Sequence, residues 1–211
     1  MSESLENIRL TKRPLVVCDV DDVVLEFVTP FRAFLASRGL RLLPRSFRLH
    51  GNIVGESDDT RVEADAVSAL LEGFFAEQEQ WQSPFSDATG ALRALSETAD
   101  LIFLTAMPPQ HFAARRRLLD RFGFTYPLIA AKEAKGPLVR HLHGERALPV
   151  AFIDDMVHNL HSVGEHVPQC LLVHLPPPID IHQLAPPAGD HVRRARDWPE
   201  ALGLISAHLA G

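Results

Sequence analysis

The chain has 211 residues, of which 46% are hydrophobic and 23% are charged, a composition typical of one folded domain or of one domain with an insert. Its formal net charge of −6 argues against binding to a nucleic acid polymer through a broad basic surface. No apolar stretch is long enough to span a bilayer, and residues 1–13 lack the apolar centre of a secretory signal, so we expect a cytoplasmic protein without a membrane partner.

The first predicted element is a buried strand that ends in a group of acids. The run from Leu15 to Val24 starts with apolar residues and then carries Asp19, Asp21 and Asp22. A short apolar run bounded by polar residues is typical of a buried strand, and open α/β sheets place their ligand sites at the carboxyl ends of strands. Burying such carboxylates unpaired would cost on the order of several kcal/mol each. A divalent cation is the simplest compensating group, and an acidic surface turn is the alternative.

The next segment interrupts the rhythm of short strands and helices. It is too long for one crossover, and the loop-forming residues after Pro44 divide it. We predict a helix over residues 31–38, an irregular segment over 40–60 and a helix with a continuous apolar stripe over 62–80. The sequence therefore predicts a small helical cap, residues 26–86, inserted after the first strand, and a core domain made of residues 1–25 and 87–211.

Strands and helices alternate through the rest of the chain. Four further apolar runs predict strands over residues 101–104, 126–130, 150–153 and 170–173. Helices are predicted over residues 88–99, 109–122, 135–142, 157–163 and 199–209. We expect residues 176–189 to form an irregular surface excursion and residues 191–195 to form a short strand. This alternation indicates a three-layer, doubly wound parallel sheet, which is a Rossmann-like α/β fold.

Polar side chains follow several of the predicted strands. Thr105 follows the second strand, Lys132 or Lys135 follows the third, and Asp154 and Asp155 follow the fourth. Because the carboxyl ends of parallel strands share one edge of the sheet, we expect these groups to converge with the acids of the first strand. Carboxylates can hold a hard cation, and a hydroxyl and an ammonium group can bind phosphate oxygens. The set is suited to phosphoryl chemistry.

The ordered residues Asp19-x-Asp21-x-Val23-Val24, Thr105, Lys135-Gly136 and Asp154-Asp155 resemble the four motifs of the haloacid dehalogenase superfamily of phosphatases. The resemblance covers the presumed core, from about residue 15 to residue 173. It implies that Asp19 is the nucleophile, that Asp21 is the general acid and base, and that Thr105 and Lys135 bind phosphate. It also implies a Mg²⁺ ion held by the carboxylates of Asp19, Asp154 and Asp155 and by the backbone carbonyl of Asp21.

Several of these side chains have two interpretations. Thr105 binds phosphate or caps the following helix. Lys132 competes with Lys135, although Lys135-Gly136 resembles the start of a helix in the superfamily more closely. The basic runs 115–117 and 193–194 could bind anions, but we interpret them as a solvated helix face and a strand edge.

The metal ligands and the first motif also carry open points. Asp155 is our first choice for direct coordination, and Asp154 coordinates directly or through water. Asn159 fits a pattern of the superfamily or is a polar residue on a helix face. The sequence departs from the commonest motif at two positions, because Asp22 stands where glycine is usual and Val23 where threonine is common.

The resemblance implies a magnesium-dependent phosphomonoester hydrolase that acts on a small phosphorylated metabolite through an aspartyl-phosphate. Residues 84–95 and 196–200 also resemble the cytosolic 5'(3')-deoxyribonucleotidase-like branch, which suggests a nucleotidase. The alternatives are a protein that binds phosphate ligands without catalysis and a signalling domain that is phosphorylated on aspartate. Candidate substrate contacts in the cap are Phe27, Phe31, Arg45, Phe47, Arg48 and Asn52, with core packing as the alternative for each aromatic residue.

Cysteines and histidines predict no further site. Cys18 and Cys170 both lie in apolar runs, which indicates buried thiols in a reducing compartment. The closest histidine pairs, in 141–143 and 158–161, lack cysteine or acidic partners at zinc spacing. We therefore expect the eleven histidines to be scattered over the surface rather than gathered in a dedicated metal site.

Overall fold

The computed structural model describes residues 8–211. The first seven residues lie outside the described residues. They include part of the predicted core portion 1–25 and most of residues 1–13, the stretch in which we expect no secretory signal. Within the described part of the chain, no helix combines the length and the apolar character needed to cross a membrane.

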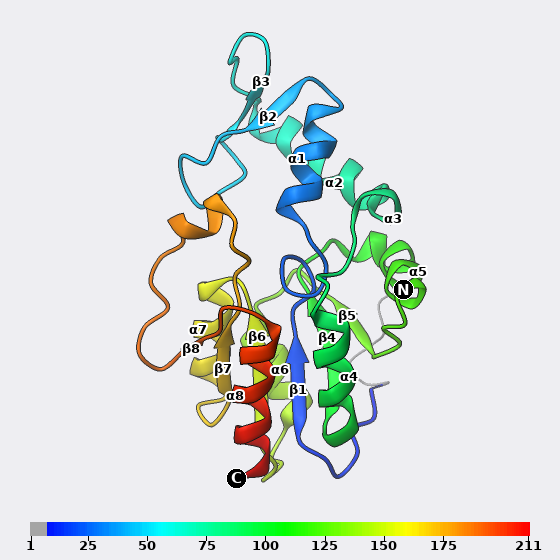
Figure 1. Ribbon diagram of the computed structural model, residues 1–211, viewed down its shortest axis with the longest axis vertical. Coiled ribbons are helices and arrows are strands. Elements are labelled where there is room, and N and C mark those ends of the chain that lie inside the picture. Colours follow the sequence, from blue (N-terminus) through cyan, green and yellow to red (C-terminus); the bar gives the residue numbers. More distant parts are fainter. Residues whose placement is uncertain (1–7) are drawn as a thin grey trace.

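A six-stranded parallel sheet forms the lower part of the molecule in Figure 1, with the strand order β5-β4-β1-β6-β7-β8. The central strand β1 pairs with β4 on one side and β6 on the other. The strands are β1 (Leu15–Cys18), β4 (Asp100–Thr105), β5 (Leu128–Ala130), β6 (Val150–Asp154), β7 (Leu171–His174) and β8 (Arg193–Arg194). This order and the parallel pairing confirm the predicted doubly wound α/β fold.

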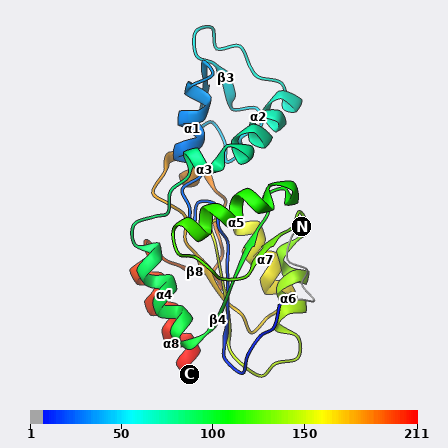
Figure 2. The same ribbon diagram turned by 90° about the vertical axis from the view of Figure 1, so that its right-hand side faces the viewer.

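Helices cover both faces of the sheet, as Figure 2 shows. Because side chains alternate along a strand, Val16 and Cys18 face the side of α4 and α8, whereas Leu15 and Val17 face α6 and α7. Asp197 begins α8 by accepting a hydrogen bond from the backbone N–H of Glu200 at 2.9 Å. The helices are α4 (Ala88–Thr98), α5 (Phe112–Arg121), α6 (Lys135–His143), α7 (Val157–His166) and α8 (Trp198–Ala210).

The segment predicted as a cap lies above the carboxyl ends of the strands (Figure 1). It has its own apolar cluster, in which Phe31, Phe34 and Phe74 are fully buried and the ring of Phe74 packs edge-on against those of Phe31 and Phe34. Its elements are α1 (Val28–Ala36), β2 (Leu40–Leu42), β3 (Ile53–Gly55), α2 (Ala64–Ala76) and α3 (Gln78–Trp81). The boundaries 26 and 86 of the cap stay predictions.

Three local predictions differ from the structure. The segment predicted as irregular contains an antiparallel hairpin, β2–β3, because Leu42 and Ile53 pair and bury their side chains in the cap. The predicted helix over 62–80 breaks at Glu77, and the side chain of Gln78 donates to the carbonyl of Phe75 across the break. The predicted helix over 109–122 begins as the short 3₁₀ turn η2 (Pro109–His111).

The excursion over residues 176–189 is not wholly a surface feature. It contains the 3₁₀ helix η3 (Asp180–Leu184), whose Ile181 packs into the apolar cluster of the cap. Asp180 pairs with Arg32 of α1 at 2.6 Å. The excursion is therefore a second connection between the sheet and the cap, and it carries His182 into a buried position.

Candidate active site

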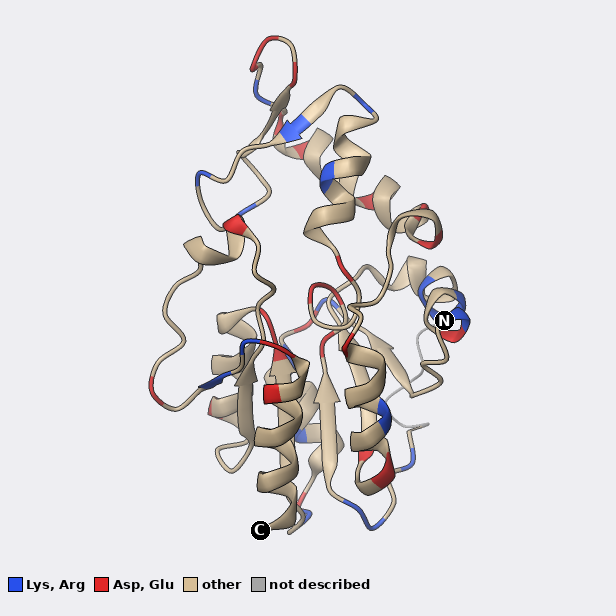
Figure 3. Cartoon of the chain, in the orientation of Figure 1, with Lys and Arg blue, Asp and Glu red and all other residues tan. Residues whose placement is uncertain are grey.

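The predicted acids meet at the ends of two neighbouring strands. Asp19 follows β1 directly, and Asp154 is the last residue of β6. Because Cys18 pairs with Ile153, the backbone N–H of Asp19 donates to the carbonyl of Ile153 at 2.9 Å, and the two acids lie side by side. Figure 3 shows the acidic loops between the sheet and the cap. The carboxyl edge of the sheet thus positions both carboxylates.

Lys135 joins these two acids. Its Nζ donates to Asp154 Oδ2 at 2.6 Å and to Asp19 Oδ1, and all three side chains are buried. Asp154 is held further by the backbone N–H of Met156 at 2.7 Å and by the amide of Asn159 at 3.1 Å. Lys132 is exposed. The structure therefore brings Lys135, and not Lys132, to Asp19 and Asp154. It also places Asn159 in contact with Asp154.

Burial and mutual repulsion govern the protonation of the acids. Burial, together with the neighbouring Asp154 and Asp21, raises the pKa of Asp19 from its ordinary 3.8 to about 7, although Lys135 opposes this shift. Burial and the carboxylates of Asp154, Asp19 and Asp22 also raise the pKa of Asp155. Burial lowers the pKa of Lys135, but Asp154 and Asp19 outweigh that effect and keep the pKa above its ordinary value. The ammonium stays charged while the acids compete for protons or cations.

This competition predicts a pH dependence of stability. Between about pH 4 and 7, folded metal-free protein holds a proton on Asp19 that the unfolded chain has lost, so the free energy of unfolding falls as the pH rises through this range. Asp19→Asn removes this contribution. We expect the stability of the variant, relative to wild type, to increase from pH 4 to pH 7 in urea unfolding with a chelator present. A difference that does not change with pH would contradict this.

A close contact between α6 and α7 places Lys135. A Cβ on Gly136 would lie 2.2 Å from the carbonyl oxygen of Ser162 and 2.7 Å from Nδ1 of His166. We expect Gly136→Ala to lower the free energy of unfolding by about 1–3 kcal/mol, because the helices must separate. The matched control is Gly90→Ala on α4, where a Cβ meets nothing within 4 Å and a gain of about 0.5–1 kcal/mol is expected. Equal effects in urea unfolding would contradict the prediction.

Three of the acids form a group that suits a hard cation. Carboxylate oxygens of Asp19, Asp154 and Asp155 lie within 4.8 Å of one another, and all three residues are buried. An all-oxygen donor set of this kind fits Mg²⁺ or a similar ion, and such an ion would offset the burial and the repulsion that raise the pKa values of Asp19 and Asp155. The predicted backbone ligand at Asp21 stays a prediction.

Asp21 takes part in a different network. Its carboxylate accepts hydrogen bonds from Arg115 Nη1 and Nη2 at 3.0 and 2.8 Å, from Gln82 at 2.9 Å and from Thr105 at 3.1 Å. Arg115 also donates to Gln82 and Gln78. Thr105 accepts from the N–H of Met107, so it closes a turn and does not cap a helix. The proposed proton carrier is thus held by four donors, two of them from Arg115.

Arg115 is one of the site residues that the sequence interpretation missed. The run 115–117 was expected to be a solvated helix face, and this is wrong for Arg115, which is fully buried. Arg115 lies on the face of α5 that also buries Leu118 and Leu119. The spacing of residues 115, 118 and 119, which share one face of a helix, was the available signal. A charged residue on the apolar face of a helix implies a buried partner of opposite charge.

Asp22 has a local structural role. Its φ of 57° lies in the left-handed region, where the glycine of the commoner motif would be unstrained. Its carboxylate accepts from the backbone N–H of Phe27 at 2.8 Å and of Val28 at 3.2 Å, at the start of α1. It also contacts Nε2 of His182 at 3.0 Å. The acid therefore joins the start of the cap to the excursion that carries η3.

The candidate substrate residues fall into three groups. Phe31 lies in the core of the cap, and the amide of Asn52 donates to backbone carbonyls of Ser46 and Arg48, so both serve local structure. Phe47 and Arg48 line a pocket of about 180 Å³ that also reaches Asp22, Asp155 and His182. Phe27 lines the same pocket, whereas Arg45 is exposed.

Comparisons with solved structures identify the class of fold. A haloacid dehalogenase-like hydrolase from Streptococcus pneumoniae is 13% identical, with a TM-score of 0.59, over 92% of this chain and 99% of that chain. A protein described as a predicted phosphoglycolate phosphatase from Haemophilus somnus is 15% identical, with a TM-score of 0.60, over 92% and 99%. A haloacid dehalogenase family hydrolase from Deinococcus radiodurans, with bound phosphate and sodium, is 16% identical, with a TM-score of 0.57, over 92% and 96%.

The chain therefore has the haloacid dehalogenase fold. No protein-family model matches it, and a search of curated proteins finds no match. At these identities the similarity concerns the fold, and the roles of individual residues rest on the geometry described above.

Proposed function

We propose that this protein is a phosphomonoester hydrolase that acts on a small phosphorylated metabolite. The observation that carries the proposal is the buried contact of Asp19 with Lys135, at the carboxyl edge of the sheet and beside the Asp154–Asp155 pair. A carboxylate nucleophile, an ammonium group and a cation-binding group in one place are the parts that phosphoryl transfer needs. The phosphate bound in the structurally similar Deinococcus radiodurans hydrolase supports this assignment.

In the proposed reaction, a carboxylate oxygen of Asp19 attacks phosphorus, and the bond from phosphorus to the leaving oxygen breaks. Asp21, protonated, gives its proton to the leaving alkoxide. Asp21 then takes a proton from water, whose oxygen attacks phosphorus, releasing inorganic phosphate and restoring Asp19. Lys135 and Thr105 would bind the phosphate oxygens. Because both oxygens of Asp21 are engaged by Arg115, Asp21 must leave part of this network before it can donate a proton.

We propose Mg²⁺ as the cofactor, held by Asp19, Asp154 and Asp155, with the backbone carbonyl of Asp21 as a further ligand. When bound, the ion reduces the repulsion between an anionic nucleophile and an anionic substrate. The three carboxylates fit this role, since their oxygens lie within 4.8 Å of one another.

The cap contributes the part of the site that contacts the leaving group. Phe47 and Arg48 border the pocket of about 180 Å³ between the cap and the acids, which suits a small ester rather than a polymer. An aromatic ring and an arginine are suited to a base and a second anionic group, respectively. Nucleotidase activity of the 5'(3')-deoxyribonucleotidase type is therefore the finer proposal.

The test is phosphate release from a panel of nucleoside monophosphates, sugar phosphates and amino-acid phosphates, measured with Mg²⁺ and with a chelator. We expect steady turnover of at least one small ester, dependent on the metal. Loss of turnover on chelation that returns with Mg²⁺ supports the cofactor assignment. No turnover of any ester would contradict the proposed hydrolase.

One observation favours a second candidate, a protein that binds phosphate ligands without catalysis. The four hydrogen bonds to Asp21 hold the proposed proton carrier in place. Saturable binding of phosphate esters without release of phosphate would support this candidate. The remaining alternative, a signalling domain phosphorylated on aspartate, predicts a long-lived phosphoenzyme on Asp19 and no steady turnover.

A further inference from the structure

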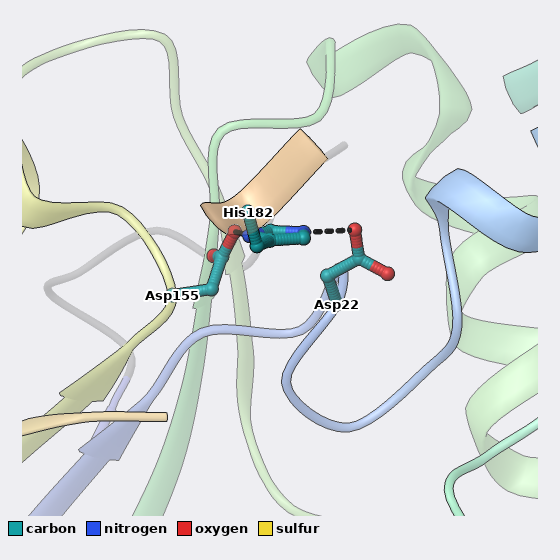
Figure 4. A group of neighbouring side chains, drawn as sticks. All are labelled: Asp22, Asp155 and His182. Carbon is teal, nitrogen blue, oxygen red and sulfur yellow. Dashed lines mark hydrogen bonds and ion pairs between the residues drawn. The ribbon is translucent and has the colours of Figure 1, made fainter. Parts of the chain in front are cut away.

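His182 lies between two carboxylates, one from each side of the site (Figure 4). Its Nε2 is 3.0 Å from Asp22 Oδ2, and its Nδ1 is 3.7 Å from Asp155 Oδ2. The histidine side chain is 4% exposed, and those of Asp22 and Asp155 are 3% and 6% exposed. The position contradicts the expectation of surface histidines, as do those of the buried His143 and His174.

The hydrogen bond to Asp22 sets the arrangement of the imidazole ring. In the tautomer whose Nε2–H donates to Asp22, Nδ1 carries a lone pair. This Nδ1 is buried, and no group within residues 8–211 forms a hydrogen bond with it. The 3.7 Å separation from Asp155 is too long for a hydrogen bond. In this tautomer, the lone pair of Nδ1 faces a carboxylate oxygen of Asp155 in a buried position.

This geometry is typical of two ligands of one metal ion. Ligand atoms bound to one ion at about 2.0–2.2 Å lie about 3–4 Å apart, which includes the observed 3.7 Å. Histidines that bind metals usually donate their other N–H to a carboxylate, which fixes the orientation of the ring, and Asp22 occupies that place. The buried Nδ1 without a hydrogen-bond partner, its separation from Asp155 and the supporting acid are separate observations with the same implication.

The site is distinct from the all-oxygen group that suits Mg²⁺. His182 groups with Asp22 and Asp155, whereas Asp19 and Asp154 form the other group, and only Asp155 belongs to both. In the Mg²⁺ group, Lys135 already neutralises part of the charge. Among residues 8–211, no lysine or arginine forms an ion pair with Asp155, so less of its charge is offset than at Asp19 or Asp154.

We infer that His182 Nδ1 and Asp155, supported by Asp22, bind a divalent transition-metal ion of the Zn²⁺, Mn²⁺ or Co²⁺ class, next to the proposed Mg²⁺ site. An imidazole nitrogen beside a carboxylate favours such ions over Mg²⁺, which prefers oxygen ligands. The pocket of about 180 Å³ borders all three residues, so water or an oxygen of a ligand can reach the ion's other positions. The inference does not depend on the proposed hydrolase activity.

The test locates the metal directly. Crystals of the full chain, grown with saturating Mg²⁺, are soaked in Co²⁺, and anomalous difference maps show where cobalt binds. Calorimetric titration of Co²⁺ into the Mg²⁺-saturated protein gives the affinity. The informative variant is His182→Gln, because the amide nitrogen of glutamine can still donate to Asp22 while the Nδ1 ligand is lost. The control is the double variant His161→Gln, His191→Gln. It removes two neighbouring histidines elsewhere in the molecule, whose ring centroids lie 5.2 Å apart.

We expect a cobalt peak within bonding distance of His182 Nδ1 and Asp155 in wild type and in the control. His182→Gln should lose the peak and weaken the binding by at least about tenfold. Cobalt confined to the Asp19–Asp154 group, a peak that persists in His182→Gln, or no cobalt binding in the presence of Mg²⁺ would each overturn the inference. The wild-type map decides the matter even if the variant does not fold.

Discussion

Asp19→Asn should reduce steady phosphate release by about a thousandfold or more, because an amide oxygen is a far weaker nucleophile than a carboxylate. The fold should survive the change, since Lys135 keeps its 2.6 Å contact with Asp154. The measurement is the initial rate of phosphate release from the best ester of the panel, with Mg²⁺ present.

Asp190→Asn is the matched control for this experiment, because it makes the same chemical change at an exposed position. Its rate should equal that of wild type. If Asp19→Asn retained a rate near that of wild type, Asp19 would not be the nucleophile. Binding of esters by a wild-type protein that shows no turnover would instead support the non-catalytic candidate.

Arg115→Met should lower the free energy of unfolding by about 3–5 kcal/mol, the usual cost of breaking a buried ion pair by removing one partner. Arg115 is fully buried, and the side chain of Asp21 is 19% exposed, so solvent screens the pair little. The change also leaves the side-chain oxygens of Gln78 and Gln82 without their donor. Urea unfolding of both proteins measures the loss.

A double-mutant cycle separates the ion pair from the packing of the arginine side chain. Arg115→Met combined with Asp21→Asn should cost clearly less than the sum of the two single changes, because Asp21→Asn removes the carboxylate that Arg115→Met leaves unpaired. Arg93→Met at an exposed position should stay within about 0.5 kcal/mol of wild type. Additive single effects would show that Arg115 and Asp21 are not coupled.

Much of the fold and the acidic centre could be predicted because their signals are local. An apolar run followed at once by Asp19, or by Asp154 and Asp155, marks both a strand and the edge at which its polar residues lie. Parallel pairing then brings the ends of β1 and β6 together without any further information. Lys135 could be preferred over Lys132 because glycine follows it, and Gly136 is the residue that allows α6 and α7 to approach closely.

The features that were missed depend on contacts between distant residues. The burial of Arg115 follows from Asp21, 94 positions away, and that of His182 follows from Asp22, 160 positions away. The β2–β3 hairpin was missed because each strand has only three residues, which is too short for an alternating pattern to be recognised. Composition assigns such residues to the surface, and only the tertiary fold shows otherwise.

The position of β1 in the sheet has a consequence for the synthesis of the protein. Leu15 pairs with Asp100 on one side and with Val150 on the other, so the strand that precedes Asp19 lacks its second neighbour until most of the chain has left the ribosome. Sheets built from such distant pairings fold slowly and expose apolar strands meanwhile. A nascent chain that ends before residue 150 therefore keeps an unpaired edge on its central strand, and we expect such fragments to need chaperones or to aggregate.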